Sequence, residues 1–123
     1  MYVDGFLVPV KKVKLEEYRA AAEAMGKIFL KHGALATTEA VADDVDPGEL
    51  TSFPRAVQLE EDETVVFSWI TWPDRATRDA GQKKVFDDPD GQAQMSVFMG
   101  DDPAVAGKRM VYGGFTPIVE LTA

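Results

Sequence analysis

Two carboxylates, Asp4 and Glu39, are the side chains of this sequence best suited to chemistry, because both fall inside segments expected to be β-strands. Acidic residues are disfavoured in strands, and a partly enclosed sheet face can shift their pKa values toward general acid or base catalysis. The competing interpretation is a solvated strand face or a structural ion pair. The spacing of the two residues defines no reaction, so no catalytic residue is assigned.

Aromatic residues near these carboxylates predict the walls of a pocket. Asp4 shares its strand parity with Phe6, and Phe67 shares its parity with Trp69 in a second β-rich segment. We expect these four side chains to line one interior face of the sheet, with Glu39 entering from a neighbouring strand. The alternative for the aromatic residues is a purely structural core.

Glycines in the last β-rich segment predict a hollow beside these residues. Gly113 and Gly114 interrupt a segment expected to pair with the first strand, which carries Gly5. Three missing side chains would leave space, and Tyr112 would supply a hydrogen-bonding group there. The alternative is that the glycines mark bulges or close packing.

The elements that must position these residues follow from hydrophobic periodicity. Leu15, Tyr18, Ala22, Met25 and Phe29 recur at spacings of three and four, which predicts an amphipathic helix over 14–32. Glycine at position 33 then ends the helix. The remaining prediction is strands over 2–10, 34–43, 55–59, 64–72 and 108–121, a helix over 73–86 and a short helical segment over 92–98.

This succession predicts one α+β domain over residues 1–123 with the ferredoxin-like βαββαβ topology. In that topology the sheet is antiparallel and both helices cover one face. The other face then exposes aromatic residues or finds a partner, and β-branched and aromatic side chains on both parities of 64–72 favour the second outcome. We therefore expect a homodimer formed through the sheet.

Several short motifs resemble those of the YbaA-like family of uncharacterised bacterial proteins, also called domain of unknown function 1428. The motifs are YVDGF (2–6), GAL (33–35) with Glu39 and DDV (43–45), VVFSWI (65–70), Arg78-Asp79-Ala80 and KRMVYGGF (108–115). The resemblance covers nearly the whole chain. It implies a ferredoxin-like fold of the dimeric α/β-barrel type, and it implies no established activity and no catalytic residue.

Composition excludes several classes of partner and site. The 123-residue chain carries 21 acidic and 13 basic residues, and its net charge of −8 argues against nucleic acid or an anionic membrane as a partner. With no cysteine and only His32, it offers neither a thiolate nucleophile nor a cysteine or multi-histidine metal site, and we expect no metal and no cofactor. Without a signal-peptide pattern or an apolar run of roughly 18 residues, the cytoplasm is the expected location.

Two functional hypotheses remain open on these observations. In the first, the protein binds or transforms a small apolar or aromatic metabolite in a pocket between sheets, without a cofactor. In the second, it is a non-catalytic homodimer whose aromatic face is its interface, and its role is exerted through a protein partner. The sequence does not separate the two.

Overall fold

Four antiparallel strands in the order β2-β3-β1-β4 form the sheet of the computed structural model, which describes residues 1–123. The two longest strands, β1 and β3, pair at the centre over their whole length. The succession of strands and helices and this strand order are those of the ferredoxin-like α+β fold, which confirms the prediction. The strands are β1 (Tyr2–Lys11), β2 (Ala36–Val41), β3 (Glu63–Trp72) and β4 (Val111–Phe115).

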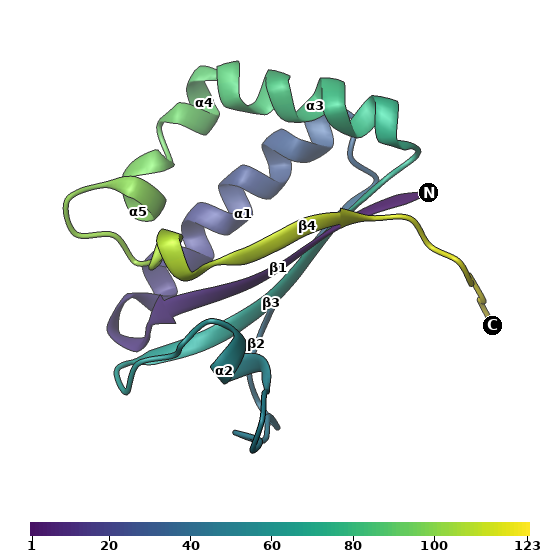
Figure 1. Ribbon diagram of the computed structural model, residues 1–123. Coiled ribbons are helices and arrows are strands. Elements are labelled where there is room, and N and C mark those ends of the chain that lie inside the picture. The colour runs from purple at the N-terminus through teal and green to yellow at the C-terminus, as the bar shows by residue number, and fades with distance from the viewer.

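One face of the sheet is covered by helices and the other is largely open (Figure 1). The covering helices are α1 (Leu15–Lys31), α3 (Arg75–Asp87), α4 (Pro89–Gln92) and α5 (Met95–Met99). Only the short helix α2 (Phe53–Ala56) lies on the other side. We call the two sides of the sheet the helix side and the open face. Two 3-10 turns, 12–14 and 107–109, precede α1 and β4.

Helix α1 forms as its periodicity predicts. Tyr18, Ala22 and Met25 are buried against the sheet, and the helix ends at Lys31. Gly33 has a φ of +112°, a left-handed conformation that glycine adopts without a steric penalty. The chain can therefore turn at once into β2.

A hydrogen-bonded aspartate joins the end of α1 to the start of α4. Asp88 caps α4 by accepting from the backbone N–H of Asp90, and its Oδ2 lies 3.0 Å from Lys31 Nζ and 2.8 Å from His32 Nε2. These contacts lower the pKa of Asp88 to about 2, and the hydrogen bond with His32 has the largest effect. His32 therefore contacts a carboxylate at the end of α1.

Three predicted segments differ from the observed ones. Residues 55–59 form no strand, because Ser52 caps a helical turn by accepting from the backbone N–H of Arg55, with Pro54 in its first turn. Helix α3 begins at Arg75, after the capping residue Asp74. The last strand covers only Val111–Phe115, and residues 116–123 form neither helix nor strand.

The core lies between the helix side of the sheet and α1. Its largest cluster contains Val8, Val10 and Tyr18, and a second cluster surrounds Trp72, whose side chain is fully buried. Phe6 packs against both clusters. Among the helices, none combines the length and the apolar character needed to cross a membrane.

Candidate functional site

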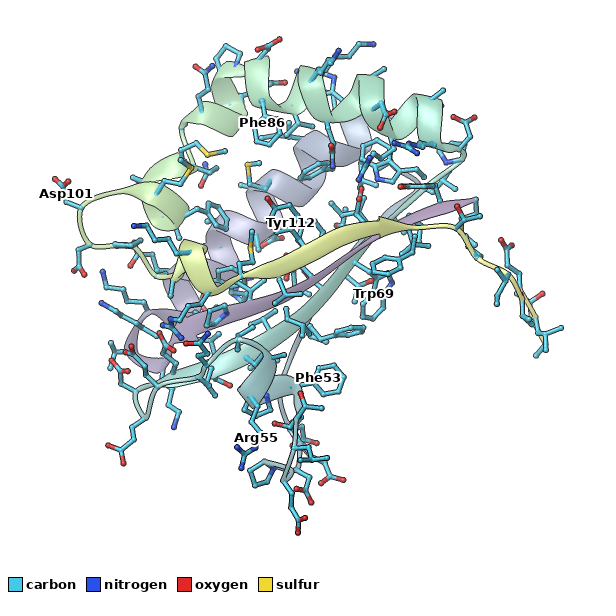
Figure 2. All side chains as sticks on the ribbon, viewed as in Figure 1. Phe53, Arg55, Trp69, Phe86, Asp101 and Tyr112 are labelled. Carbon is cyan, nitrogen blue, oxygen red and sulfur yellow. The ribbon has the colours of Figure 1, made fainter.

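The register of the central strands separates the predicted pocket residues onto two faces. Asp4 lies opposite Ile70 and Gly5 lies opposite Trp69. Because directly opposed residues share a face, Asp4 and Trp69 point to opposite sides of the sheet. Figure 2 shows Trp69 below β4, on the side away from the helices. The prediction that these carboxylate and aromatic side chains share one interior face was therefore wrong.

The two faces divide the predicted set as follows. Asp4, Phe6, Tyr112 and Gly114 lie on the helix side, where β1 and β4 pair. Glu39 is also on the helix side, but on β2, two strands away from Asp4. Phe67, Trp69 and Gly113 lie on the open face. The alternation of side chains within each strand was predicted correctly. Alternation alone does not show which residues of two neighbouring strands lie on the same face of the sheet.

Asp4 is buried, with an exposed fraction of 2%, and its carboxylate is surrounded by hydrogen-bond donors. Trp72 Nε1 donates to Oδ2 at 2.9 Å, and Arg78 donates from Nε at 3.1 Å and from Nη2 at 2.7 Å. Gln82 Nε2 lies 3.4 Å from Oδ2. The Asp4 carboxylate raises the pKa of Arg78 further above its usual value. Charge-assisted, two-point contact of this kind fixes the orientation of both groups.

The guanidinium of Arg78 also packs on Tyr2 of β1, beside β4. Its Cζ lies 5.1 Å from the centre of the Tyr2 ring, a cation–π distance. A Cβ at position 114 would overlap the Tyr2 hydroxyl and lie 2.7 Å from Arg78 Nη2. Glycine at position 114 is thus what allows edge strand β4 to approach this pair.

A stripe on α3 faces this part of the sheet. Arg78, Gln82 and Phe86 are four residues apart and so share one side of the helix. Across from them, Tyr112 lies opposite Phe6 in the pairing of β4 with β1. We call Asp4, Phe6, Tyr112 and Gly114, together with Arg78, Gln82 and Phe86, the helix-side site.

The rim of the helix-side site is accessible to solvent. Tyr112 is 70% exposed and Phe86 is 61% exposed, although both are large aromatic side chains. Figure 2 shows Tyr112 on the helix side of β4. An open apolar hollow of about 420 Å³ lies beside Phe86, lined by Met95, Ser96, Met99 and Gly100. The site thus combines a buried charged end with an exposed aromatic rim.

Glycines on β1 and β4 do not leave the hollow that their small size suggests. On the open face, the Phe115 ring would lie 3.7 Å from a Cβ at Gly5 and 3.6 Å from one at Gly113. The ring therefore packs over the glycine pair. On the helix side, Tyr2 and Arg78 fill the space beside Gly114. Close packing, the alternative interpretation, describes these glycines.

Glu39 belongs to a separate hydrogen-bonded pair. The buried Tyr18 hydroxyl donates to its Oε2 at 2.9 Å. Burial raises the pKa of Glu39, although its bonds with Tyr18 and Ser68 oppose that shift. Burial and the nearby Glu39 carboxylate raise the pKa of Tyr18 as well. This pair links α1 to edge strand β2, and its hydrogen bond is separate from those that Asp4 accepts.

A cluster of acidic residues also lies away from the site. Carboxylate oxygens of Glu60, Asp62 and Glu63 lie within 4.8 Å of one another, which is close enough to hold a cation. Arg109 already binds both oxygens of Glu63, at 2.8 and 2.5 Å, and lowers its pKa. An arginine therefore supplies the positive charge at Glu63, and we assign no metal site here.

Sequence reasoning missed three contributors to the helix-side site: Trp72, Arg78 and Gln82. Asp74 lies four residues before Arg78, but Asp74 caps α3 and Arg78 binds Asp4 and Asp79. A signal was present in the four-residue spacing of Arg78, Gln82 and Phe86. That spacing shows a shared helix side, but only the fold places that side over Asp4.

Fold and site together define a ferredoxin-like α+β domain that encloses a buried carboxylate–guanidinium pair between its sheet and its helices. The family described as "Protein of unknown function (DUF1428)" matches residues 1–100, and the chain belongs to that family. It is 44% identical over 119 residues to "Uncharacterized protein YbaA" of Escherichia coli K12 and to the protein of that name in Shigella flexneri, with 97% of each chain covered. The resemblance noted in the sequence is thereby confirmed.

A solved structure extends the comparison to fold alone. The "Putative antibiotic biosynthesis monooxygenase from Nitrosomonas europaea" superposes with a TM-score of 0.57 at 13% sequence identity. The match covers 97% of this chain and 100% of that one. The likeness therefore concerns the ferredoxin-like α+β fold alone.

Proposed function

We propose that the protein binds a small apolar or aromatic molecule bearing a carbonyl group at the helix-side site. The observation that carries this proposal is the junction of a fixed guanidinium with an exposed aromatic rim. Large aromatic side chains that project into solvent beside a buried polar group are characteristic of ligand sites, which are mostly apolar with a few placed polar groups. Tyr112 and Phe86 provide the apolar contact and Arg78 provides the polar one.

Arg78 has donors left for a ligand. A guanidinium carries five N–H groups. Asp4 engages one on Nε and one on Nη2, and Asp79 engages one on Nη1. One N–H on each terminal nitrogen has no acceptor among these contacts. Since two carboxylates already balance the charge of Arg78, a neutral carbonyl oxygen suits these donors better than an anion does.

The chemistry of Asp4 supports binding more than proton transfer. Its two oxygens are occupied by Trp72, Arg78 and Gln82, so the carboxylate acts as a positioning group that holds the guanidinium. Glu39, the other predicted carboxylate, is directed to Tyr18. The Nitrosomonas protein of this fold is named as a putative monooxygenase of antibiotic biosynthesis, which supports a small-molecule ligand. A cofactor-free reaction would have to rely on Tyr112 for orientation.

The test is a thermal-shift titration with menadione, a neutral aromatic dicarbonyl, beside a panel of uncharged aromatic ketones. Binding to the folded state at a hundred times the dissociation constant adds about 2.7 kcal/mol to stability, so the melting temperature should rise. Phe86→Ala and Tyr112→Ala should lose this rise. Phe53→Ala, an equivalent truncation of a half-exposed phenylalanine on the open face, is the matched control and should keep it. An unchanged response in both helix-side variants would overturn the proposal.

We propose in addition that two copies pack their open faces together. The chain exposes 8066 Å², whereas a compact monomer of 13.5 kDa exposes about 6,500 Å². The difference, roughly 1,500 Å², exceeds the approximately 800 Å² that each partner buries in an interface of ordinary size. Exposed Phe67 and half-buried Trp69 lie at the centre of this face, among uncharged neighbours. On a chain with a net charge of −8, a face whose centre is uncharged is where a second copy can approach with least repulsion.

Light scattering should give twice the mass of 13.5 kDa for the full chain at micromolar concentration. Phe67→Glu should convert the dimer to a monomer, because it would place two charges in an apolar interface without partners. Phe86→Glu introduces the same charge at an exposed phenylalanine of α3 and should leave the dimer intact. A monomeric wild-type chain would refute this part of the proposal.

A non-catalytic homodimer is the second candidate, and one observation favours it. Every buried side-chain nitrogen and oxygen has a hydrogen-bond partner within the chain. The Asp4 cluster is therefore complete as a structural element without a ligand. Under this alternative the open face still forms the dimer, and no compound of the panel changes the melting temperature.

A further inference from the structure

The last eight residues of the chain expose apolar side chains to an unusual degree. Ile118, Val119 and Leu121 are 95%, 71% and 89% exposed, although they lie within four positions of one another. Residues 116–123, which we call the C-terminal tail, form no helix or strand and leave the sheet at the end of β4 (Figure 1). A cluster of this kind, projecting from a folded body, indicates an interaction segment.

A second apolar surface extends from the centre of the open face toward its β2 edge. Ala40 on β2 and Phe67 on β3 are directly opposed, and the Phe53 ring of α2 packs edge-on against Phe67 at 5.9 Å between ring centres. All three residues are exposed in the single chain. We call Ala40, Phe53 and Phe67 the β2 strip. Because β2 and β4 are the two edge strands, the tail leaves the sheet at one edge and the β2 strip lies toward the other.

We infer that the C-terminal tail of each copy packs on the β2 strip of the second copy. This inference rests on the proposed dimer through the open faces. A two-fold axis makes each contact occur twice, so two apolar surfaces at opposite edges of one face can satisfy each other when β4 of one copy lies over β2 of the other. A single symmetric arrangement would then cover both surfaces that the isolated chain leaves exposed.

Distances and chemistry favour packing of the tail on the second copy over packing on its own chain. Strands lie about 4.8 Å apart, so the sheet is roughly 14 Å wide between β2 and β4, while eight extended residues reach about 26 Å. The tail is therefore long enough to cross the partner's sheet. In its own chain it runs away from α2, as Figure 1 shows. Pro117 has no amide hydrogen and so disfavours continued pairing of the tail with β1.

Disulfide cross-linking tests the exchange, since the natural chain contains no cysteine. Ile118→Cys protein is mixed with Ala40→Cys protein, oxidised and separated on a non-reducing gel. The inference predicts a mixed dimer at about ten times or more the yield obtained when Val13→Cys replaces Ile118→Cys, because proximity raises the effective concentration of the two thiols. Val13 is the matched control, because it is an apolar residue as exposed as Ile118 but lies before α1.

Two further measurements distinguish failure of the tail exchange from failure of the proposed dimer. In a chain carrying both cysteines, the bond should form between copies, and a bond within one chain would overturn the inference. A chain that ends at Phe115 should dimerise with a dissociation constant raised by about tenfold or more, which light scattering over a dilution series measures. A full chain that is dimeric but gives no more cross-link than the Val13 control would refute the exchange alone. A monomeric full chain would refute the proposed dimer and the exchange with it.

Discussion

Trp72→Ala should lower the free energy of unfolding by about 3–5 kcal/mol, because truncating a fully buried aromatic residue removes its apolar contacts and leaves a cavity. The Trp72 side chain has an exposed fraction of 0% and packs edge-on against Phe29 at 6.1 Å between ring centres. A Cβ at Gly81 would lie only 2.5 Å from a carbon of the indole. The helices therefore enclose the ring closely, and the surrounding structure has little freedom to collapse into the space.

The loss has a polar part that a second variant isolates. Trp72→Phe keeps most of the ring but removes the N–H that donates to Asp4 Oδ2. Leaving a buried acceptor short of one partner costs about 1–3 kcal/mol, so this variant should fall between the wild type and Trp72→Ala. Urea unfolding followed by circular dichroism, at one protein concentration throughout, measures both losses. Val13→Ala, at a residue that is 91% exposed, should stay within about 0.5 kcal/mol of the wild type.

The other tryptophan of β3 should respond differently. Trp69 lies three residues before Trp72 on the same strand, and the sequence predicts only that it lines an interior face of the sheet. The structure leaves Trp69 half-buried on the open face, beside Phe67 at 5.3 Å between ring centres. Its truncation should therefore affect dimer formation more than the stability of each chain. If Trp72→Ala unfolded no more easily than Trp69→Ala, the assignment of Trp72 to the core would be wrong.

The fold was predictable because its signals are local and repeated. The three-and-four spacing from Leu15 to Phe29 defines α1, and the β-branched and aromatic run before Pro73 defines β3. The errors came from shorter signals. The turn at Ser52 to Arg55 depends on one capping hydroxyl, and apolar residues after Phe115 resemble a strand although no neighbouring strand pairs with them.

The candidate site was harder to predict, because it depends on register and on contacts across long stretches of sequence. Asp4 and Arg78 are 74 residues apart, and nothing in their local sequence indicates that they meet. Parity placed Asp4 with Phe6 correctly but could not choose between the two faces of β3. Local spacing does contain part of the answer, since Arg78 lies one turn before Gln82 and both contact Asp4.

The second large effect is expected at the buried ion pair. Asp4→Asn nearly preserves the shape of the side chain but removes the negative charge that Arg78 binds from two nitrogens. The side chains of Asp4 and Arg78 are 3% and 17% exposed, so water can replace the lost charge only in part. Removing one partner of such a pair costs about 3–5 kcal/mol, mainly because the remaining charge is left without compensation. The free energy of unfolding should fall by about that amount.

A double-mutant cycle distinguishes the ion pair from simple loss of a hydrogen bond. Arg78→Gln alone should also be destabilising, but Asp4→Asn combined with Arg78→Gln should lose less than the sum of the two, because no unpaired charge remains. Arg75→Gln is the matched control on the same helix, since Arg75 is well exposed and lies 3.7 Å from Asp79, and its urea midpoint should not change. Strictly additive losses would mean that Asp4 and Arg78 act independently. The guanidinium would then have no fixed position from which to bind a carbonyl, and the proposed ligand site would lose its polar anchor.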